Sequence, residues 1–448
     1  MTYTPNTPAD RAAMLEAVGV ASVDELFRDI PNQVPGLDLP PALSEMEAVR
    51  LMRELAAQNA DLSRYACFLG AGAYRHYIPS TVAHVIGRSE FYTAYTPYQP
   101  EVSQGTLQTI YEYQSLITEL TGMDAANASM YEGASAVGEA VIMATAITKR
   151  RKAVLAATLH PHYREVARTY AEGPALRIVE VGPDLGRSFD GRLPIARVRE
   201  SLDGETAALI VQQPNFLGSI EDLRALADAA HAVGALLVVA VNPIALGLLE
   251  TPGAAGADIV VGEGQPLGIP LAYGGPWLGI FAARGQYVRQ MPGRIVGMTN
   301  DLDGRRGFVL TLQTREQHIR RERATSNICT NVALCALAST VYLSTVGKEG
   351  LRKVANLSVQ KAHYAAERIG GLPGYEVANR APFFDEFVVR CPAPVDQIQA
   401  SLAEQHILAG FALGRAYPRL SDALLLCCTE MNTREEIDRL VEGLGAFR

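Results

Sequence analysis

Six short apolar runs follow one another between residues 153 and 283 of this 448-residue chain, separated by polar or helical segments. The runs are continuous rather than alternating, as expected of strands that are covered on both faces of a sheet. Between two of them, residues 219–234 have the periodicity of a crossover helix that begins at Ser219. The pattern predicts an α/β fold with a doubly wound, mostly parallel sheet. The predicted strands are 153–158, 177–182, 207–213, 236–241, 258–262 and 278–283.

The flanking regions have different patterns. Residues 45–60 show helical periodicity, and such a segment cannot bury its apolar stripe alone. Residues 61–125 are dense in tyrosine and are predicted to be loop-rich, with a long helix following from about residue 135. A long helical stretch is predicted over 314–347. The C-terminal segment alternates predicted helices and strands, namely helices 349–370, 395–405 and 433–445 and strands 375–379, 386–391 and 423–428.

These patterns predict three parts. We expect a helical N-terminal arm and cap over 1–90, a large α/β domain over 91–345 and a small C-terminal α+β domain over 346–448. A large parallel-sheet domain, a long linking helix and a small α+β domain together are the arrangement of fold-type I enzymes that use pyridoxal phosphate (PLP). Because doubly wound sheets host many chemistries, the architecture alone gives only an analogy.

Composition excludes several classes of function. The net charge is -8 and the basic residues are scattered, so we expect no nucleic-acid binding. The chain has neither the pattern of a signal peptide nor an apolar run of the roughly 18 residues that span a bilayer, so we expect a cytoplasmic protein without membrane contact. The six cysteines lack paired Cys-x-x-Cys spacing, which indicates reduced core residues and no metal site.

Several stretches carry a more specific signal than the architecture, namely residues 92–108, 120–140, 256–276, 291–297 and 312–330. They closely resemble the P protein of the glycine cleavage system, glycine dehydrogenase (decarboxylating). In that family the protein is one chain of about twice this length or two separate subunits, and the cofactor lysine belongs to the C-terminal half or to the second subunit. The chain therefore resembles subunit 1, the α subunit of the split form.

The residues at the expected cofactor positions do not suit PLP. An imine needs a primary amine, and the turn after the strand at 258–262 offers Gln265 and Pro266 instead of a lysine. Asn242 stands where an aspartate would face the pyridine nitrogen. Glu132 precedes the helix whose N-terminus would bind the phosphate, and its charge would repel a dianion. The sequence predicts a degenerate cofactor site.

Each of these residues also has a plainer interpretation. Asn242 is equally explained as a turn residue before Pro243, and Gln265 as a polar loop residue. His160 follows a strand where this fold often stacks an aromatic ring on the cofactor, or it is a hydrogen-bonded loop histidine. All of these interpretations predict that this chain holds no PLP covalently.

Fold-type I enzymes usually build each active site at a subunit boundary, so a chain without its own cofactor can complete the site of its neighbour. Tyr95, Tyr98 and Gln99, with Tyr92 nearby, lie in a proline-punctuated segment and are the candidate catalytic groups for a shared site. Tyrosine can hydrogen-bond a substrate carboxylate or a cofactor phosphate while its ring excludes water. Packing in the interface is the alternative role.

A second candidate group lies in the stretch 312–330. Arg315, His318 and Glu322 have helical spacing, and one of the neighbouring arginines could steer a glycine carboxylate or an acidic partner. We name Arg315, His318 and Arg321 as candidates for substrate or partner binding. An ion-paired helix is the alternative.

The resemblance implies a specific activity. Glycine would lose its carboxylate as CO2 on PLP held by subunit 2, the β subunit, and the aminomethyl group would pass to the lipoyl arm of the H protein. The assembly would be αβ or α2β2, with this chain inactive alone. Two alternatives stay open: a purely structural or regulatory partner of subunit 2, and a self-sufficient PLP enzyme whose lysine is one of the five in the chain.

Overall fold

The computed structural model describes residues 6–31, 38–186, 189–324 and 326–447. It divides into two compact units, residues 1–60 and 61–448. In the first unit, the side chains of Thr7 and Ser44 cap helices α1 and α2 and form capping boxes with Asp10 and Glu47. None of the residues in its helices is buried. These helices are α1 (Pro8–Val18), η1 (Asp24–Phe27) and α2 (Glu45–Ala56).

A seven-stranded sheet with the order β2-β8-β7-β6-β5-β3-β4 is the centre of the second unit. All six predicted strands are present, and β3 to β7 run parallel. Strand β8 runs antiparallel to β7, because a loop rather than a crossover helix connects them. The strands are β2 (Ala125–Ala126), β3 (Lys152–Ala156), β4 (Arg177–Val181), β5 (Thr206–Gln213), β6 (Leu236–Val241), β7 (Ile259–Glu263) and β8 (Gly279–Ala283).

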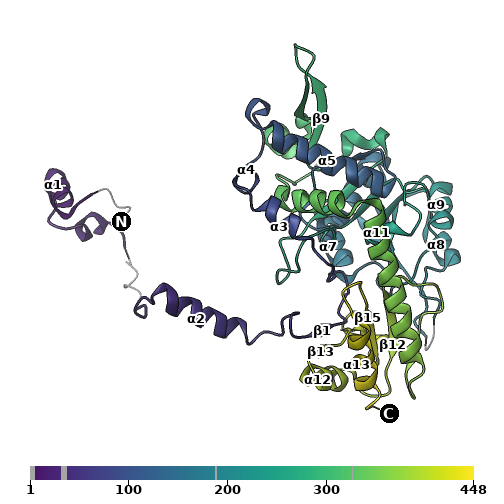
Figure 1. The fold of residues 1–448 in the computed structure, drawn as a ribbon. Helices are drawn as coiled ribbons and strands as arrows, with labels where there is room; N and C mark the ends of the chain where they lie inside the picture. The colour runs from purple at the N-terminus through teal and green to yellow at the C-terminus, as the bar shows by residue number, and fades with distance from the viewer. Residues whose placement is uncertain (1–5, 32–37, 187–188, 325, 448) are drawn as a thin grey trace. The chain divides into compact units, whose positions relative to one another are not determined.

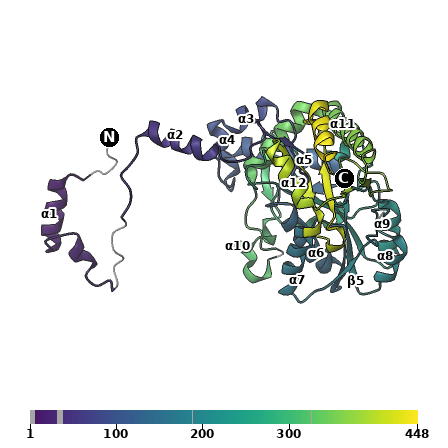
Figure 2. The ribbon, with the colours of Figure 1, turned by 90° about the horizontal axis from the view of Figure 1, so that it is seen from below.

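Helices cover this sheet, and β3, β5, β6, β7 and β8 are buried along their whole length. Figure 2 shows α8 and α9 side by side next to β5. The strands are rich in Val, Ile, Leu and Ala because both of their faces pack against side chains. The helices and short turns of this part are α3 (Ser80–Ile86), α4 (Ser89–Tyr92), η2 (Pro100–Val102), α5 (Gln104–Thr121), α6 (Gly133–Thr148), α7 (Pro161–Glu172), α8 (Ile195–Ser201), α9 (Leu223–Ala232), η3 (Ala245–Gly247) and η4 (Gly285–Gln290).

The C-terminal part has its own antiparallel sheet, with the order β11-β12-β15-β14. The long helix α11 runs from the region of α3 and α5 to this sheet (Figure 1). Residues Ala66–Cys67 (β1) pair with Ile407–Leu408 (β13). The elements are α11 (Ala333–Gly370), β11 (Glu376–Val377), β12 (Glu386–Arg390), α12 (Val395–Glu404), β14 (Phe411–Ala412), η7 (Leu413–Arg415), η8 (Pro418–Leu420), β15 (Ala423–Cys427) and α13 (Arg434–Leu444).

The prediction for 61–125 was wrong in part, because Gln104–Thr121 forms an 18-residue helix, α5. Its buried residues recur at helical spacing. The preceding tyrosines and prolines lie in short helices and in the loops between them, and they masked this periodicity. The residues that α5 buries are Leu107, Ile110, Tyr113, Gln114, Ile117 and Thr121.

The predicted helix over 314–347 was also wrong in its first half. Residues 313–323 form three short turns, and α11 begins at Ala333. Arg321 has a φ of 52°, outside the helical region, and ends the second turn. The turns are η5 (Gln313–Arg315), α10 (Gln317–Arg320) and η6 (Arg321–Arg323).

The crossover helix α9 begins later than predicted. Its N-cap is Asp222, whose side chain accepts the backbone N–H of Ala225. Ser219 lies instead in a buried turn. A hairpin of β9 (Ile295–Asn300) and β10 (Arg306–Thr311), which the sequence analysis did not predict, packs against α5.

Candidate functional site

A cleft of about 790 Å³ lies at the carboxyl ends of the parallel strands. Parallel α/β sheets bind ligands at this edge, because the loops that follow the strands converge there. The loop after β3 supplies His160, the loop after β5 supplies Phe216, and β7 ends at Glu263. The N-terminal end of α6 completes the wall with Glu132 and Ala134.

The N-terminus of α6 is already satisfied by carboxylates of the chain itself. Glu132 is the N-cap, and its side chain accepts the backbone N–H groups of Ala134 at 2.6 Å and of Ser135 at 2.9 Å. Glu263 accepts the N–H of Gly133 at 2.9 Å. The first turn of a helix is a ready site for an anion, and here two side chains occupy it.

The buried side chain of Glu263 also holds the neighbouring loops together through hydrogen bonds. Besides Gly133, it accepts the backbone N–H groups of Gln265 and Leu278, both at 3.0 Å. Burial raises the pKa of this carboxyl to about 7, and the backbone donors oppose the shift. The sequence analysis missed Glu263, because its partner at the start of α6 is distant in the chain.

Gln265, at the position where the lysine would lie, is a structural residue with only 2% of its surface exposed. Its Nε2 atom donates to the carbonyl oxygens of Tyr74 at 3.0 Å and Ile269 at 2.8 Å, and its Oε1 atom accepts the N–H of Tyr74 at 2.9 Å. The adjacent Pro266 is buried. The carboxamide therefore joins the segment at residue 74 to the loop after β7.

Asn242 closes a turn at the end of β6. Its Oδ1 atom accepts the backbone N–H of Ile244 at 3.1 Å, which is an Asx turn. The plainer of the two interpretations from the sequence describes this geometry.

His160 is the N-cap of α7 and is held at both ring nitrogens. Its Nδ1 atom accepts the backbone N–H of His162 at 3.1 Å, so the ring proton lies on Nε2. The Nε2 atom donates this proton to the carbonyl oxygen of Ala71 at 2.8 Å. Burial lowers the pKa of His160 to about 4, so the ring is neutral. One face stacks on Tyr163, with 4.8 Å between the ring centroids. A side chain added at Gly133 would collide with the hydroxyl of Tyr163, so this tyrosine fills the space beside the helix N-terminus.

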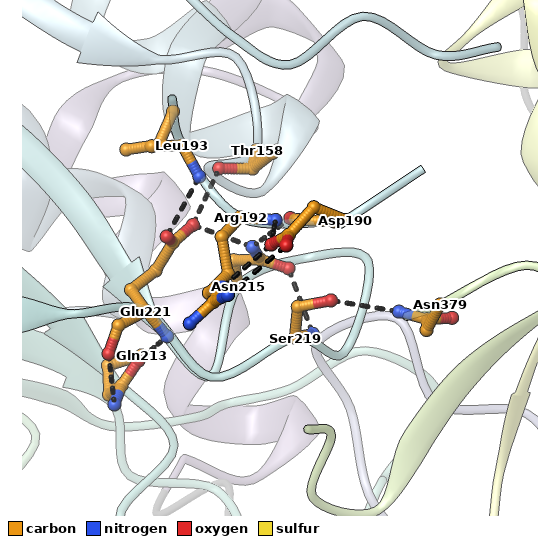
Figure 3. A network of polar contacts seen from close by, with 10 residues as sticks. Thr158, Asp190, Arg192, Leu193, Gln213, Asn215, Ser219, Glu221 and Asn379 are labelled. Atoms are coloured by element: carbon orange, nitrogen blue, oxygen red, sulfur yellow. Dashed lines mark hydrogen bonds and ion pairs between the residues drawn. The ribbon is translucent and has the colours of Figure 1, made fainter. Parts of the chain in front are cut away.

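A buried polar network holds the loop that carries Phe216 (Figure 3). Glu221 accepts from Asn215 at 2.7 Å and from the backbone N–H of Leu193 at 2.9 Å. Burial raises the pKa of Glu221 to about 7. Asn379 donates to Ser219 at 2.9 Å, which ties the loop to the C-terminal part of the unit.

The residues in and beside the cleft do not fit covalently bound PLP. The carboxamide of Gln265 cannot form an imine and is fully hydrogen-bonded, and the backbone donors that would hold a phosphate are bonded to Glu132 and Glu263. Lys152 cannot replace the missing amine, because it begins β3 at the opposite edge of the sheet and donates to Ser201 and Asp203.

Residues 92–99, which we call the tyrosine segment, form a second candidate site. Tyr95 is 87% exposed, Tyr98 is 48% exposed, and Gln99 is also exposed. The hydroxyl oxygen of Tyr98 accepts a hydrogen bond of 3.0 Å from Nη2 of Arg294. Of the three predicted catalytic residues, Tyr98 is the one that this contact holds in a defined position.

The structure brings Tyr98 together with one of the second group of candidates, His318. The two rings are arranged edge to face, with 6.1 Å between their centroids. Nδ1 of His318 lies 3.7 Å from Oε2 of Glu316. Arg294 contacts both Tyr98 and Glu316 and was missed by the sequence analysis, although the stretch 291–297 had been singled out. A single arginine before a short strand gives no periodic signal.

The helical spacing predicted that Arg315 and His318 share a helix face, but Arg315 does not join this group, and neither does Arg321. Arg315 is buried and donates to the carbonyl oxygens of Met291, of Gly293 at 3.0 Å and of Leu312 at 3.1 Å. It therefore holds the loop that leads to Arg294. Arg321 is exposed at the start of η6.

The sheet order and the cleft at its carboxyl edge define a class of proteins, those that share the fold of the fold-type I PLP enzymes. The structure of Burkholderia pseudomallei sphingosine-1-phosphate lyase has this fold, with a TM-score of 0.67 and 14% identity over 94% of this chain and 93% of that chain. The chain belongs to one family within the class, the glycine cleavage system P-protein, whose family model matches residues 1–444.

Curated relatives and a crystal structure agree with this assignment. Probable glycine dehydrogenase (decarboxylating) subunit 1 of Desulforamulus reducens is 55% identical over 450 residues, covering 100% of both chains. The same subunit of Thermomicrobium roseum is 57% identical over 447 residues, covering 99% of both. A crystal structure of glycine decarboxylase (P-protein), in inhibitor-bound form, has a TM-score of 0.90 and 43% identity over 100% of both chains. The resemblance to subunit 1 is confirmed.

Across the described ranges, every helix is too short or too polar to span a bilayer.

Proposed function

We propose that this chain is the non-PLP-binding α subunit of a glycine-cleaving heteromer in the cytoplasm. Subunit 2 would hold the PLP that acts as electron sink for the decarboxylation of glycine, with release of CO2 and transfer of the aminomethyl group to the lipoyl arm of the H protein. The observation that carries the proposal is Gln265, a buried and fully hydrogen-bonded carboxamide at the position of the lysine.

Within this assembly the chain would supply hydrogen-bonding groups and shape. The hydroxyl of Tyr98 would donate a hydrogen bond to an anionic group in the shared site. The exposed Tyr95 and Gln99 would line the approach to that site. Arg321 and His318, both exposed, would face the substrate or an acidic partner. Arg315 would act through the loop that it holds.

Reconstitution tests the proposal. The chain, subunit 2 and the equimolar mixture are each supplied with PLP, glycine and lipoylated H protein, and CO2 release and the visible absorbance of bound PLP are recorded. Activity is expected from the mixture alone, and bound PLP from the mixture and not from this chain. A PLP spectrum or glycine decarboxylation from this chain alone would overturn the proposal.

A purely structural role is the second candidate, and the internal hydrogen bond of Tyr98 favours it, since this hydroxyl oxygen already has a partner. Tyr95→Phe and Tyr98→Phe separate the two roles. If Tyr98 contacts a charged group in the shared site, its loss should lower kcat/KM by roughly tenfold or more in an intact complex. Full turnover by both variants would indicate the purely structural role.

A further inference from the structure

Arg294 joins three segments of the chain at one buried guanidinium, which is 4% exposed. It precedes β9, and its Nη1 atom donates to Oγ1 of Thr330 at 3.0 Å while Nη2 donates to Tyr98 at 3.0 Å. Its Nε atom lies 3.7 Å from Oε2 of Glu316. The tyrosine segment and the segment 312–330 therefore share one anchor.

The chemistry of this contact fixes how Tyr98 is presented. A guanidinium has donors and no acceptor, so the hydroxyl oxygen of Tyr98 must accept from Arg294. The hydroxyl proton is then free for another acceptor, and the half-exposed position of Tyr98 lets that acceptor come from outside the chain. A neighbouring positive charge also makes the hydroxyl a better donor to an anion.

The bonding of Arg294 differs from that of a purely structural arginine. Arg315 donates from Nε and from both terminal nitrogens to backbone carbonyl oxygens. In Arg294, within the described residues, Nε is buried without a hydrogen-bond partner, and both terminal nitrogens donate to side-chain hydroxyls. The Nε atom faces the carboxylate of Glu316 at 3.7 Å, so none of the three nitrogens of Arg294 is committed to the backbone.

The neighbouring tyrosines lack this anchor. Tyr92 and Tyr95 are 69% and 87% exposed, and their hydroxyls make no hydrogen bond within the part of the chain that the structure describes. Of the three, Tyr98 is the one whose donor direction is set before a ligand arrives. Such preorganisation reduces the entropy lost on binding.

We propose that Arg294 is a positioning residue, which holds the hydroxyl of Tyr98 as a hydrogen-bond donor toward an anionic oxygen in the site shared with subunit 2. The oxygen belongs to a carboxylate of the amino-acid substrate or to a phosphate of the cofactor held by the partner. This inference rests on the function proposed above and adds to it the residue that orients the donor.

A double-mutant cycle in the reconstituted complex tests the inference, with Tyr98→Phe, Arg294→Met and the double variant. If both residues act through one hydroxyl, each single change lowers kcat/KM for glycine by roughly 10- to 100-fold, and the double variant is no worse than Tyr98→Phe alone. Arg294→Lys keeps a charge and a donor and should retain more activity than Arg294→Met. Arg352→Met, an exposed change on the second half of α11, is the matched control.

The same variants identify the anion. A higher KM for glycine with unchanged retention of PLP assigns the carboxylate, and faster loss of PLP with unchanged KM for glycine assigns the phosphate. Arg294→Met leaves the buried Glu316 without the guanidinium that lies 3.7 Å away, so Arg294→Met/Glu316→Gln provides a second variant in which that side chain is neutral.

Several outcomes would overturn the inference. The first is normal kcat/KM of Arg294→Met while Tyr98→Phe is impaired. The second is that the losses in kcat/KM add up in the double variant. The third is that neither Arg294→Met nor Arg294→Lys assembles with subunit 2, which would make Arg294 structural. Glycine turnover by subunit 2 without this chain would instead overturn the proposed function itself.

Discussion

The carboxylate of Glu132 accepts the backbone N–H of Ser135 at 2.9 Å, so the N-cap residue closes the first turn of α6 with a negative charge. A carboxylate is favourable there, because it bonds the free amides and opposes the positive end of the helix dipole. This contact also explains why the turn before α6 tolerates a glutamate at the edge of a cleft.

Replacement of Glu132 by alanine is expected to lower the free energy of unfolding by about 1 kcal/mol, the usual cost of losing an N-cap. Glu132→Ser keeps a capping oxygen and should lose less. Urea denaturation at neutral pH measures both variants. Equal stability of Glu132→Ala and wild type would show that the cap contributes nothing to α6.

Restoring the missing lysine should not restore cofactor binding. In Gln265→Lys the new ammonium group is buried, the N–H of Tyr74 loses its acceptor, and Glu132 and Glu263 still occupy the amides of α6. We expect no PLP attached at residue 265 after incubation with PLP, borohydride reduction and peptide mass analysis. Labelling at the exposed Lys348 and Lys353 gives the background. Stoichiometric labelling at 265 would contradict the interpretation of this cleft.

The central sheet could be predicted from the sequence because burial on both faces leaves continuous apolar runs, as in β6, Leu236–Val241. Helical spacing, in contrast, gave a wrong prediction over residues 314–323. Several charged residues there have helical spacing, but Arg315 bonds to carbonyl oxygens of another loop, and a positive φ at Arg321 ends the turn. Spacing reports a periodicity and does not reveal which backbone a side chain satisfies.

The candidate site was predictable where one residue type decides the chemistry. Gln265 and Asn242 could be identified as unsuitable for PLP from their side chains alone. The partners that give each residue its role were not predictable, because they are far apart in sequence. Arg294 meets Tyr98 across 196 positions, and Glu263 meets Gly133 across 130.

A buried carboxyl in α6 makes stability depend on pH. Burial raises the pKa of Glu139 to about 7 from an ordinary value of 4.5, while Ser326 opposes the shift by hydrogen bonding. The folded protein binds the carboxyl proton of Glu139 more tightly than the unfolded chain does. The free energy of unfolding therefore falls as the pH rises from 4.5 to about 7. Glu139→Gln is neutral throughout and should be more stable than wild type by about 3 kcal/mol at pH 8, with no gain at pH 4. Urea midpoints at the two pH values measure this, and an equal change at both would exclude titration of Glu139 as the cause.

Arg321 offers a test of the proposed partner surface that is separate from folding. Its neighbour Arg323 lies 3.8 Å from Glu322, whereas Arg321 is exposed at the start of η6, so Arg321→Met should change the free energy of unfolding by less than about 0.5 kcal/mol. If the surface attracts an acidic partner, the Kd for lipoylated H protein should rise roughly three- to tenfold at low ionic strength, and the difference should vanish near 1 M salt, where the Debye length is about 3 Å. Titration of the assembled complex at both salt concentrations, with Arg352→Met as control, gives the comparison. A loss of affinity that is the same at high salt would indicate a packing contact instead of electrostatic attraction, and no loss at low salt would remove Arg321 from the docking surface.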